Sequence, residues 1–465
     1  MDKSTGEELK VNDESITAEE TFTADAADMI ITLTYTLDAI TLAGTTTVVF
    51  ETLYTEGKEV GRHHEIDDEG QTVYIPEIHT TAKDQTTKIN HTEANKTATI
   101  VDTVSYTNLL PGREYTVSGT LMDKETGKTV LADGKEITAS TTFTPEKSEG
   151  SVDVIFTFDA SVVAPKTVAA FETLTYKKIQ IAVHADIEDK DQTVYIPTIR
   201  TSAKDNVTGI NHTEADKEVT ITDTVTYKGL EVGREYTVSG TLMNQRTGAK
   251  ILVNGKPVTA STTFTAEEKE GSVEVVFTFD ATALEGTTTV VFETLYTENK
   301  EVAAHTDIND KGQTIYIPKI RTTAISDDTN DHVTKADEKI TLIDTVAFTS
   351  LEVGREYTVK GVLMDKSAEK TLLVNGEEVT AETTFVPETT DGTVDVTFTF
   401  DGTGLEDTLL VAFETLYTEE KEVGVHAEIE DDAQTVYLPK IQTEAKDAVT
   451  EIDHTEALPK AKIID

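Results

Sequence analysis

One pattern, repeated four times at a constant spacing, constrains the fold of this chain most strongly. Each copy opens on a glutamine and reads as a strand: QTVYIP at 71, QTVYIP at 192, QTIYIP at 313 and QTVYLP at 434, so successive copies lie 121 residues apart. The segment Gly112-Arg113-Glu114-Tyr115 recurs with the same period at Gly233 and Gly354. A period this long without net insertions indicates a tandem array of whole domains rather than a solenoid of short repeats.

The period divides the chain into five parts. We expect a partial repeat at 1–76, complete repeats at 77–197, 198–318 and 319–439, and the first part of a further repeat at 440–465. Residues 1–6 (MDKSTG) match 122–127 (MDKETG) inside a repeat, so we expect this chain to be a window cut from a longer protein. Linkers between repeats are almost absent, which predicts a fairly stiff rod.

Within one repeat the sequence predicts only β-strands. Residues 220–227 (TITDTVTY) and 272–279 (SVEVVFTF) are rich in β-branched and aromatic residues, and turn signals such as Asn254-Gly255 separate such runs. There is no sustained apolar stripe of helical period. Short strands in a repeat of about 120 residues favour an immunoglobulin-like sandwich over a closed barrel. The expected fold is therefore all-β, with tandem immunoglobulin-like β-sandwich domains in a rod-like array.

Composition excludes several classes of function. The formal net charge of −46 argues against binding to nucleic acid or to anionic membrane surfaces. The chain has no cysteine, so a secreted form would need another source of stability than disulfides. No apolar run is long enough to span a bilayer, so no membrane insertion is expected. The acidic loops lack a twelve-residue calcium loop with a glycine pivot, and we expect neither a metal nor a cofactor.

The candidate site begins with a histidine and an aspartate at fixed distances before each repeated glutamine. The histidine stands eight positions before the glutamine and the aspartate three before it. The four triplets are His63/Asp68/Gln71, His184/Asp189/Gln192, His305/Asp310/Gln313 and His426/Asp431/Gln434. Loops usually tolerate drift, so spacing this constant in loop-like sequence indicates a geometric role, although copies of one ancestral repeat share neutral residues too.

A glutamine is neither nucleophile, acid nor base, but its amide carbon can be attacked with loss of ammonia. That reaction needs an acid and a nucleophile that recur with the glutamine. A glutamate follows an apolar run about twenty residues upstream, where burial would raise its pKa: Glu51, Glu172, Glu293 and Glu414. A threonine recurs nine residues after each glutamine, in the first expected strand of the next repeat: Thr80, Thr201, Thr322 and Thr443. The threonine of Asp223-Thr224 and its counterparts is the fallback nucleophile.

The same residues admit other interpretations. A histidine before a strand is usually a surface or hydrogen-bonding residue, and the glutamate could pair with an arginine such as Arg234. A hydrolase using the His/Asp pair is disfavoured because no Ser, Cys or metal cluster accompanies it. A ligand-binding module that recognises host glycan or protein is disfavoured by near-identical repeats. A Lys–Asn or Lys–Asp isopeptide is disfavoured because Lys83 and Lys204 are matched by Ile325.

Three motifs carry a resemblance that covers essentially the whole chain. The strand VAFETLY, the segment DTVTYxxLxxGREYTVxGxLM and the element HxDIxDxxQT resemble the VaFE repeats of Gram-positive surface proteins. They are also similar to immunoglobulin-like adhesin domains that form an internal Thr–Gln ester bond. The motifs are specific, because spacing and residue type agree in the copies.

The resemblance implies one ester crosslink in each complete repeat. The implied bonds are Thr80–Gln192, Thr201–Gln313 and Thr322–Gln434. By the same resemblance, the histidines His184, His305 and His426 would take the threonine proton, and the acid side would come from Asp189, Asp310 and Asp431 with Glu172, Glu293 and Glu414. Gln71, with Glu51, His63 and Asp68, would have no threonine in this window, and Thr443 would have no glutamine.

The implied function is mechanical. We expect a stalk segment of a cell-wall-anchored adhesin or pilus-like protein, located outside the cell, in which tension passes through the bonds. The crosslinking would be single-turnover, so the chain is not expected to be an enzyme. Anchoring to peptidoglycan and binding of a host surface ligand by a tip domain would lie in regions outside this chain.

Overall fold

Alternation of buried and more exposed residues runs along many of the long strands of this protein. In a computed structural model that describes residues 1–457 and 459–465, β8 (Ala98–Thr107) turns Ile100 and Val104 inward and Thr103 partly outward. The same period-2 pattern holds in β19 (Val219–Lys228) and β29 (Ile340–Thr349). The described residues contain strands and short 3-10 turns and no α-helix. The predicted all-β class is confirmed.

Each complete domain is a sandwich of two antiparallel sheets. In the first, β8 lies between β7 and β14 in the smaller sheet, and the larger sheet has the central order β10-β9-β15-β16, with β13 on β9 and β17 on β15. The strands of this domain are β7 (Glu77–Asp84), β8, β9 (Tyr115–Asp123), β10 (Lys128–Thr129), β11 (Leu131–Ala132), β12 (Lys135–Glu136), β13 (Thr138–Phe143), β14 (Gly150–Phe158), β15 (Thr167–Tyr176), β16 (Ile179–His184) and β17 (Thr193–Tyr195), with the turn η3 (Ala160–Val162).

The third domain repeats this topology, and the second repeats it except that an isolated bridge between Met243 and Lys250 replaces the counterpart of β10. The second contains β18 (Thr198–Asp205), β19, β20 (Glu235–Asn244), β21 (Leu252–Val253), β22 (Lys256–Pro257), β23 (Thr259–Thr265), β24 (Glu270–Phe279), η4 (Thr282–Leu284), β25 (Thr287–Thr297), β26 (Lys300–His305), η5 (Lys311–Gln313) and β27 (Thr314–Ile317). The third contains β28 (Lys319–Ser326), β29, β30 (Tyr357–Asp365), β31 (Lys370–Thr371), β32 (Leu373–Val374), β33 (Glu377–Glu378), β34 (Thr380–Phe385), β35 (Gly392–Phe400), β36 (Thr408–Thr418), β37 (Lys421–His426), η6 (Asp432–Gln434) and β38 (Thr435–Leu438).

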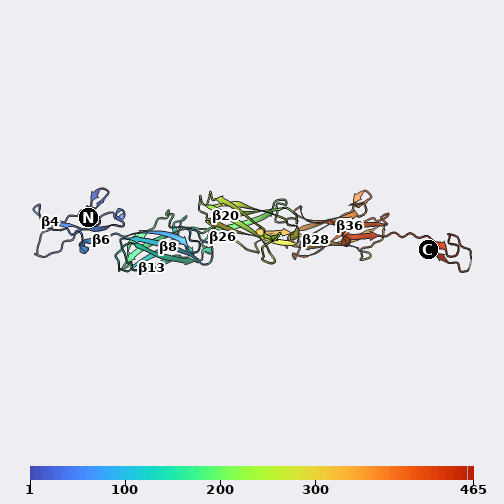
Figure 1. The fold of residues 1–465 in the computed structure, drawn as a ribbon, viewed down its shortest axis with the longest axis horizontal. Coiled ribbons are helices and arrows are strands. Elements are labelled where there is room, and N and C mark those ends of the chain that lie inside the picture. Colours follow the sequence, from blue (N-terminus) through green and yellow to red (C-terminus); the bar gives the residue numbers. More distant parts are fainter. Residues whose placement is uncertain (458) are drawn as a thin grey trace.

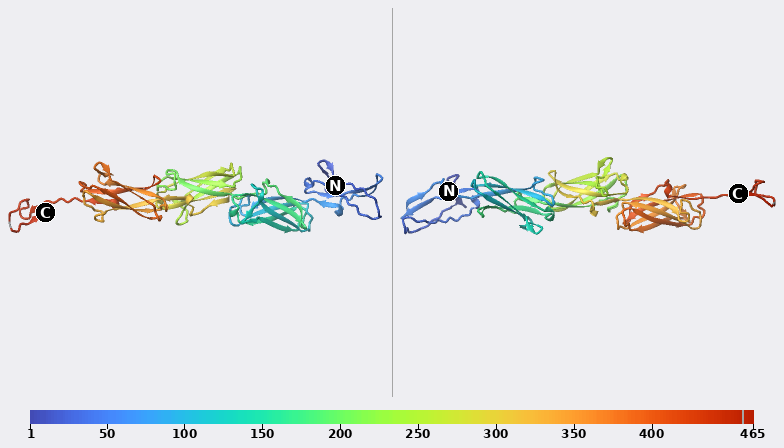
Figure 2. Two further views of the ribbon diagram at one scale, coloured as in Figure 1. Left: turned by 180° about the vertical axis from the view of Figure 1, so that it is seen from behind. Right: turned by 90° about the horizontal axis from the view of Figure 1, so that it is seen from below.

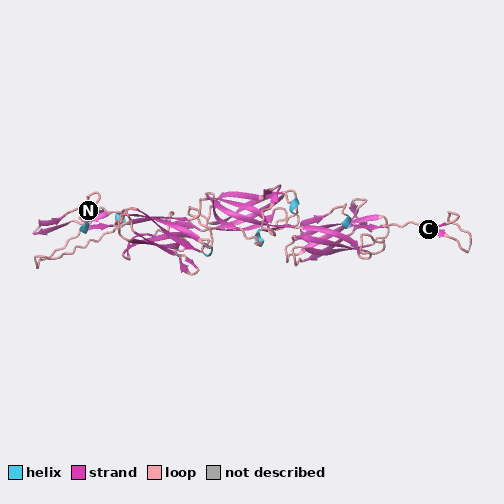
Figure 3. Cartoon of the chain, turned by 60° about the horizontal axis from the view of Figure 1, so that its bottom comes forward, coloured by secondary structure: helices cyan, strands magenta, loops and turns pink. Residues whose placement is uncertain are grey.

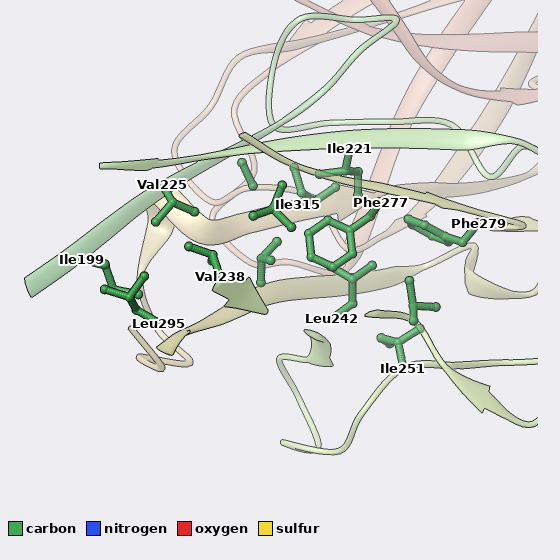
Figure 4. Close-up of a cluster of buried hydrophobic side chains, with 14 of the residues drawn as sticks. Ile199, Ile221, Val225, Val238, Leu242, Ile251, Phe277, Phe279, Leu295 and Ile315 are labelled. Carbon is green, nitrogen blue, oxygen red and sulfur yellow. The ribbon is translucent and has the colours of Figure 1, made fainter. Parts of the chain in front are cut away.

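The core of each domain lies between its two sheets. In the second domain, Ile221 and Phe277 from the smaller sheet meet Val238, Leu242 and Leu295 from the larger one (Figure 4). These five side chains are at most 1% exposed. Burial of apolar surface on this scale is the main stabilising force for sheets that each have one polar face.

The terminal segments have fewer and shorter strands. Residues 1–76 contain β1 (Lys10–Val11), β2 (Glu14–Ser15), η1 (Ile40–Leu42), β3 (Thr46–Val48), β4 (Glu51–Thr55), β5 (Lys58–His63), η2 (Glu69–Gln71) and β6 (Thr72–Tyr74), which form only two-stranded pairs. The described part of 440–465 contains β39 (Lys446–Asp447) and β40 (Ile463–Ile464). These segments supply only part of a sandwich each.

The domains follow one another end to end in an elongated row (Figure 1). Further views show the same row from behind and below, with the N- and C-terminal segments at its opposite ends (Figure 2), and magenta strands fill each of the three central bodies (Figure 3). No helix in the described residues has the length and apolarity that a membrane crossing requires.

Candidate functional site

The first and last strands of each sandwich bring a threonine and a glutamine together. Thr80 lies on β7 and points inward between Ile78 and Ala82, and Gln192 stands immediately before β17. Both side chains are buried, at 3% and 0% exposure. The amide nitrogen of Gln192 donates to the Thr80 hydroxyl oxygen at 3.0 Å, across 112 positions of sequence.

A buried glutamate completes the contact. Glu172 lies in the middle of β15 and is fully buried. Its Oε2 accepts hydrogen bonds from the Gln192 amide at 3.0 Å and from the Thr80 hydroxyl at 3.3 Å. Burial, and then the neighbouring carboxyl of Asp102, raise the pKa of Glu172 to about 10. This carboxyl therefore holds its proton at neutral pH.

The arrangement recurs in the other two complete domains. In the second, Glu293 Oε2 accepts from Gln313 at 2.8 Å and from Thr201 at 3.2 Å. In the third, Glu414 Oε2 accepts from Gln434 at 2.8 Å and from Thr322 at 3.2 Å, and the Gln434 amide also donates to Thr322 at 2.7 Å. The pKa of Glu293 is raised to about 10 and that of Glu414 to about 11, chiefly by burial and then by a neighbouring aspartate.

That aspartate is a residue that the sequence analysis did not assign to the site. Asp102 lies on β8, opposite Ala82 and two positions from the partner of Thr80. It is fully buried, and neither of its oxygens receives a hydrogen bond from an N–H or O–H donor among the described residues. Burial raises the pKa of Asp102, while Glu172, Thr80 and His184 lower it. The counterparts in the other two domains are Asp223 and Asp344.

Two carboxyls side by side in an apolar core cannot both be ionised, so the pair shares one proton. Oε1 of Glu172 likewise receives no hydrogen bond from an ordinary donor in the described chain. A proton between Glu172 Oε1 and Asp102 joins one oxygen of each carboxyl. The site thus contains an acid and a base that face one threonine and one amide.

A glycine makes room for this pair. Gly119, Gly240 and Gly361 lie opposite Glu172, Glu293 and Glu414 on the neighbouring strand. A Cβ atom added at Gly240 would approach Phe277 Cζ to 2.4 Å and Glu293 Oε1 to 3.3 Å. The absence of a side chain at the glycine therefore leaves the space that the phenylalanine ring and the glutamate carboxyl occupy.

The histidine and the repeated loop aspartate form a second pair beside the glutamate. His184 lies directly across from Glu172, on β16. Its Nε2 is 3.2 Å from Asp189 Oδ2, and the corresponding distances at His305/Asp310 and His426/Asp431 are 3.0 Å. The other oxygen of Asp189 accepts the amide N–H of Asp191 at 2.8 Å. Asp189 thus holds both the ring and the turn that precedes Gln192.

The two terminal segments contain incomplete versions of the site. Gln71 donates to Glu51, and His63 lies 2.9 Å from Asp68, so four of the expected residues meet in 1–76. No threonine contacts the Gln71 amide in the described chain, and its carbonyl oxygen is buried without a donor. Thr443 is exposed in a stretch without a strand.

The structure places the residues of the alternative interpretations away from the Thr–Gln–Glu contact. Lys83 and Lys204 point outward from β7 and β18, away from the buried site. Within the described residues no cluster of three or more His, Cys, Asp or Glu side chains has the geometry to hold a metal ion. The fallback residue Thr224 is exposed, whereas Thr201 contacts Glu293.

Comparisons with known proteins identify the family of this chain. The family model described as "T-Q ester bond containing domain" matches residues 1–75, 76–196, 197–317 and 318–438. No curated protein matches the chain. Two crystal forms of a bacterial adhesin from Mobiluncus mulieris containing intramolecular disulfide, isopeptide and ester bond cross-links are 14% and 15% identical, each covering 54% of this chain and 87% of the adhesin, with TM-scores of 0.24 and 0.23. A glycosyl hydrolase family 2 member from Bacteroides cellulosilyticus is 14% identical over 44% of this chain and 26% of the hydrolase, with a TM-score of 0.19. Likenesses this distant do not bear on function.

Proposed function

Because this chain belongs to the family of T-Q ester bond containing domains, we propose that each complete domain closes one internal ester bond and that the array is a stalk segment of a bacterial cell-surface adhesin or pilus-like protein. The proposed bonds are Thr80–Gln192, Thr201–Gln313 and Thr322–Gln434. The observation that carries this proposal is the contact of one buried threonine hydroxyl and one glutamine amide with the same protonated glutamate in all three domains.

The proposed reaction replaces an amide by an ester. The Thr80 hydroxyl oxygen attacks the side-chain carbonyl carbon of Gln192, which forms a C–O bond. The C–N bond then breaks and the nitrogen leaves as ammonia. One hydroxyl proton is transferred within the site and reaches the departing NH₂ group, so no oxidant, metal or nucleotide is needed.

The carboxyl pair is suited to this proton transfer. The Gln192 nitrogen lies 3.0 Å from Glu172 Oε2, within reach for protonation as it leaves. Burial raises the pKa of both carboxyls, but their mutual hydrogen bond lowers the pKa of Asp102 and raises that of Glu172, so Asp102 is the more acidic partner. The Thr80 hydroxyl donates to Glu172 Oε2, so we assign Glu172 as the group that takes the Thr80 proton, with Asp102 accepting the proton that Glu172 already holds, and Glu172 as the donor to nitrogen. The pair ends the reaction with the same single proton with which it began.

The His184/Asp189 pair has a supporting role in this scheme. His184 is paired with Glu172 on the neighbouring strand, and its ring contacts Asp189. A positive charge on His184 would keep Asp102 ionised, as the direction of its effect on the Asp102 pKa indicates. This differs from the expectation that the histidine itself takes the threonine proton. Replacing His305 by glutamine distinguishes the two roles. Closure of the Thr201–Gln313 bond should be abolished if the histidine takes the proton, and should only become slower if the histidine acts through its charge.

The proposed crosslink is a single event in the life of each domain and not an enzymatic turnover. The site is sealed after closure, because Gln192 and Glu172 are both fully buried. Exclusion of water protects an ester from hydrolysis. We place the protein outside the cell at the cell wall, with anchoring to peptidoglycan and binding to a host ligand in regions beyond these residues.

The intact mass of the purified chain tests the proposal. The expected deficit is three ammonias, one per complete domain, with Gln71 retaining its amide. Gln313→Ala is the matched control, and its deficit should be two. Brief treatment of the unfolded chain with neutral hydroxylamine, which cleaves esters, should add the mass of one hydroxylamine to the wild-type chain at each bond. A mass equal to that of the sequence would overturn the ester proposal and would favour a ligand-binding adhesin module without crosslinks.

A further inference from the structure

One loop of each domain reaches into the next domain. The loop between β7 and β8 places Ile89 against the core cluster of the second domain, and the loop between β18 and β19 places Ile210 against that of the third. Apolar side chains packed across a boundary bury surface only while the two domains stay docked. The end-to-end row of domains (Figure 2) therefore contains specific contacts at these two boundaries.

A histidine in the same loop bridges two tyrosines from different domains. The His91 ring stacks on Tyr195 of its own domain, with ring centroids 4.9 Å apart. Its Nε2 lies 2.7 Å from the hydroxyl of Tyr236, which belongs to the second domain. His91 is fully buried and Tyr236 is 1% exposed. The backbone of the loop is also fixed, because Tyr195 donates its N–H to Asn90 and accepts from Thr92.

The second boundary repeats the first. His212 stacks on Tyr316 at 4.8 Å, and its Nε2 lies 2.6 Å from the hydroxyl of Tyr357 in the third domain. Here further contacts cross the boundary: Arg355 donates to Asn211 at 3.1 Å, and Arg246 pairs with Asp391 at 3.0 Å.

The hydrogen bonds specify a neutral histidine. The Tyr236 hydroxyl oxygen accepts the N–H of Glu231 at 2.9 Å, which leaves its own proton free to be donated to His91 Nε2. Nδ1 then carries the ring proton and donates to Asn90 Oδ1 at 3.0 Å. Burial, and then the charge of Arg234, lower the pKa of His91 to about 3. His212 has the same environment, with Arg355 as its cationic neighbour.

The loop of the third domain has lost both side chains. Asp331 occupies the position of Ile89 and Ile210, and Val333 that of His91 and His212. The backbone clamp persists, since Thr334 donates to Tyr437 and Tyr437 donates to His332. Val333 has no atom that can bond to a tyrosine hydroxyl, and Asp331 is exposed. The loop keeps its place on its own domain but lacks the groups that engage a following one.

We propose that the loops 85–95 and 206–216 are plugs that lock consecutive domains into a rigid unit, with the Tyr236 and Tyr357 ends as their sockets. The partner that fits each socket is thus the Ile-x-His loop of a preceding repeat. By the same chemistry, the boundary after the third domain is a hinge. This inference does not depend on ester formation.

A spin-label pair across the first boundary tests the plug. Because the chain has no cysteine, Ser140→Cys and Ser261→Cys create one label site on each of the first two domains, both on exposed strand positions. The distance distribution should be narrow in the otherwise native chain. The double substitution Ile89→Asp with His91→Val gives this loop the residues found at positions 331 and 333 in the third domain. The distribution of distances between the two labels should then broaden. Tyr236→Phe, which removes only the hydroxyl, should broaden it less.

Two controls separate undocking from unfolding. A pair at Ser261→Cys and Glu382→Cys across the second boundary should stay narrow in the Ile89/His91 variant. The reverse substitutions Asp331→Ile and Val333→His should leave both distributions unchanged. The thermal unfolding transition of the first domain should persist in every variant. A distribution that is already broad in the native chain, or one that stays narrow in the Ile89/His91 variant, would overturn the plug-and-socket assignment.

Discussion

Residues 1–76 and the domain 198–318 contain the same four site residues in different surroundings. The His63/Asp68 contact at 2.9 Å matches the His305/Asp310 contact at 3.0 Å, and Gln71 reaches Glu51 as Gln313 reaches Glu293. Glu51 is only partly buried, however, whereas Glu293 is fully buried.

The difference comes from the smaller sheet. In 198–318, β18 and β19 cover the site and contribute Thr201 and Asp223, and 1–76 has no such sheet in the described structure. A local motif can therefore position a histidine, an aspartate and a glutamine. The low-dielectric environment that keeps a glutamate protonated requires the opposite face of a sandwich.

The largest expected effect comes from removing the buried acid pair. Asp223→Asn should slow closure of the Thr201–Gln313 bond by roughly 10²–10⁴-fold, the range for loss of a general acid or base. The domain 198–318 would then resemble residues 1–76 in chemistry while keeping its fold. Mass measured over time after expression should show two ammonias lost instead of three. Loss of the third at an unchanged rate would show that Asp223 takes no part.

Loss of the crosslink should lower stability. Gln313→Ala would remove the proposed bond across 112 residues, and if an ester limits the unfolded chain as a disulfide does, the cost is about 4–5 kcal/mol in the free energy of unfolding. Chemical denaturation should show an earlier transition for one of the three domains. Gln71→Ala is the matched control and should change nothing comparable, because the Gln71 amide contacts no threonine among the residues that the structure describes. Equal effects of both substitutions would contradict the bond.

A smaller effect is expected at the glycine that seats the pair. Gly240→Ala drives a Cβ toward Phe277 and Glu293, and overpacking of this kind costs about 1–3 kcal/mol. Thermal unfolding of the domain should shift downward accordingly. Gly61→Ala in the partial repeat is the control, since its Cβ would meet only Leu53 at 3.9 Å. A shift no larger than that of the control would show that a Cβ at position 240 can be accommodated beside Phe277 and Glu293.

The most gradual effect is on pH dependence in the absence of the bond. Because the pKa of Glu293 is raised from 4.5 to about 10 by folding, its stabilising protonation is fully present below pH 4.5 and is lost as pH rises toward 10. In Gln313→Ala the free energy of unfolding should fall over that window, by at most about 1.4 kcal/mol per pH unit. Adding Glu293→Gln should reduce this pH dependence to that of Asp223, whose pKa burial also raises, whereas a profile that rises with pH would contradict the assignment.

The sequence predicted the sandwich fold because alternating β-branched residues and regular turns are local signals. It also singled out His305, Asp310, Gln313, Glu293 and Thr201, whose spacing repeats. It missed Asp223, although the signal was present: in the alternation Ile221, Asp223, Val225 an acid occupies a core-facing position. The spacing of residues along the sequence did not reveal its role, because Asp223 meets Glu293 only when the two sheets pack against each other.

The contact between domains was likewise beyond local reasoning. Near-absent linkers predicted a stiff rod, and the row of domains is elongated. The Ile89/His91 pair recurs with the period of 121 residues at Ile210/His212 and Ile452/His454, although the third repeat breaks it. Its role depends on Tyr236, which lies 145 positions later. Contacts at such separation are determined by how whole domains dock.

The position of the threonine and the glutamine at the two ends of a domain also fixes how far the chain can lengthen. A bond between Thr201 and Gln313 would withhold the intervening segment from extension, which amounts to roughly 370–400 Å of contour length per domain for a chain of 112 residues. Three such domains could not absorb the energy of a sudden load by unfolding and lengthening. Their response to load would be that of a tether of constant length, which transmits a force at once and reports it undiminished at the far end.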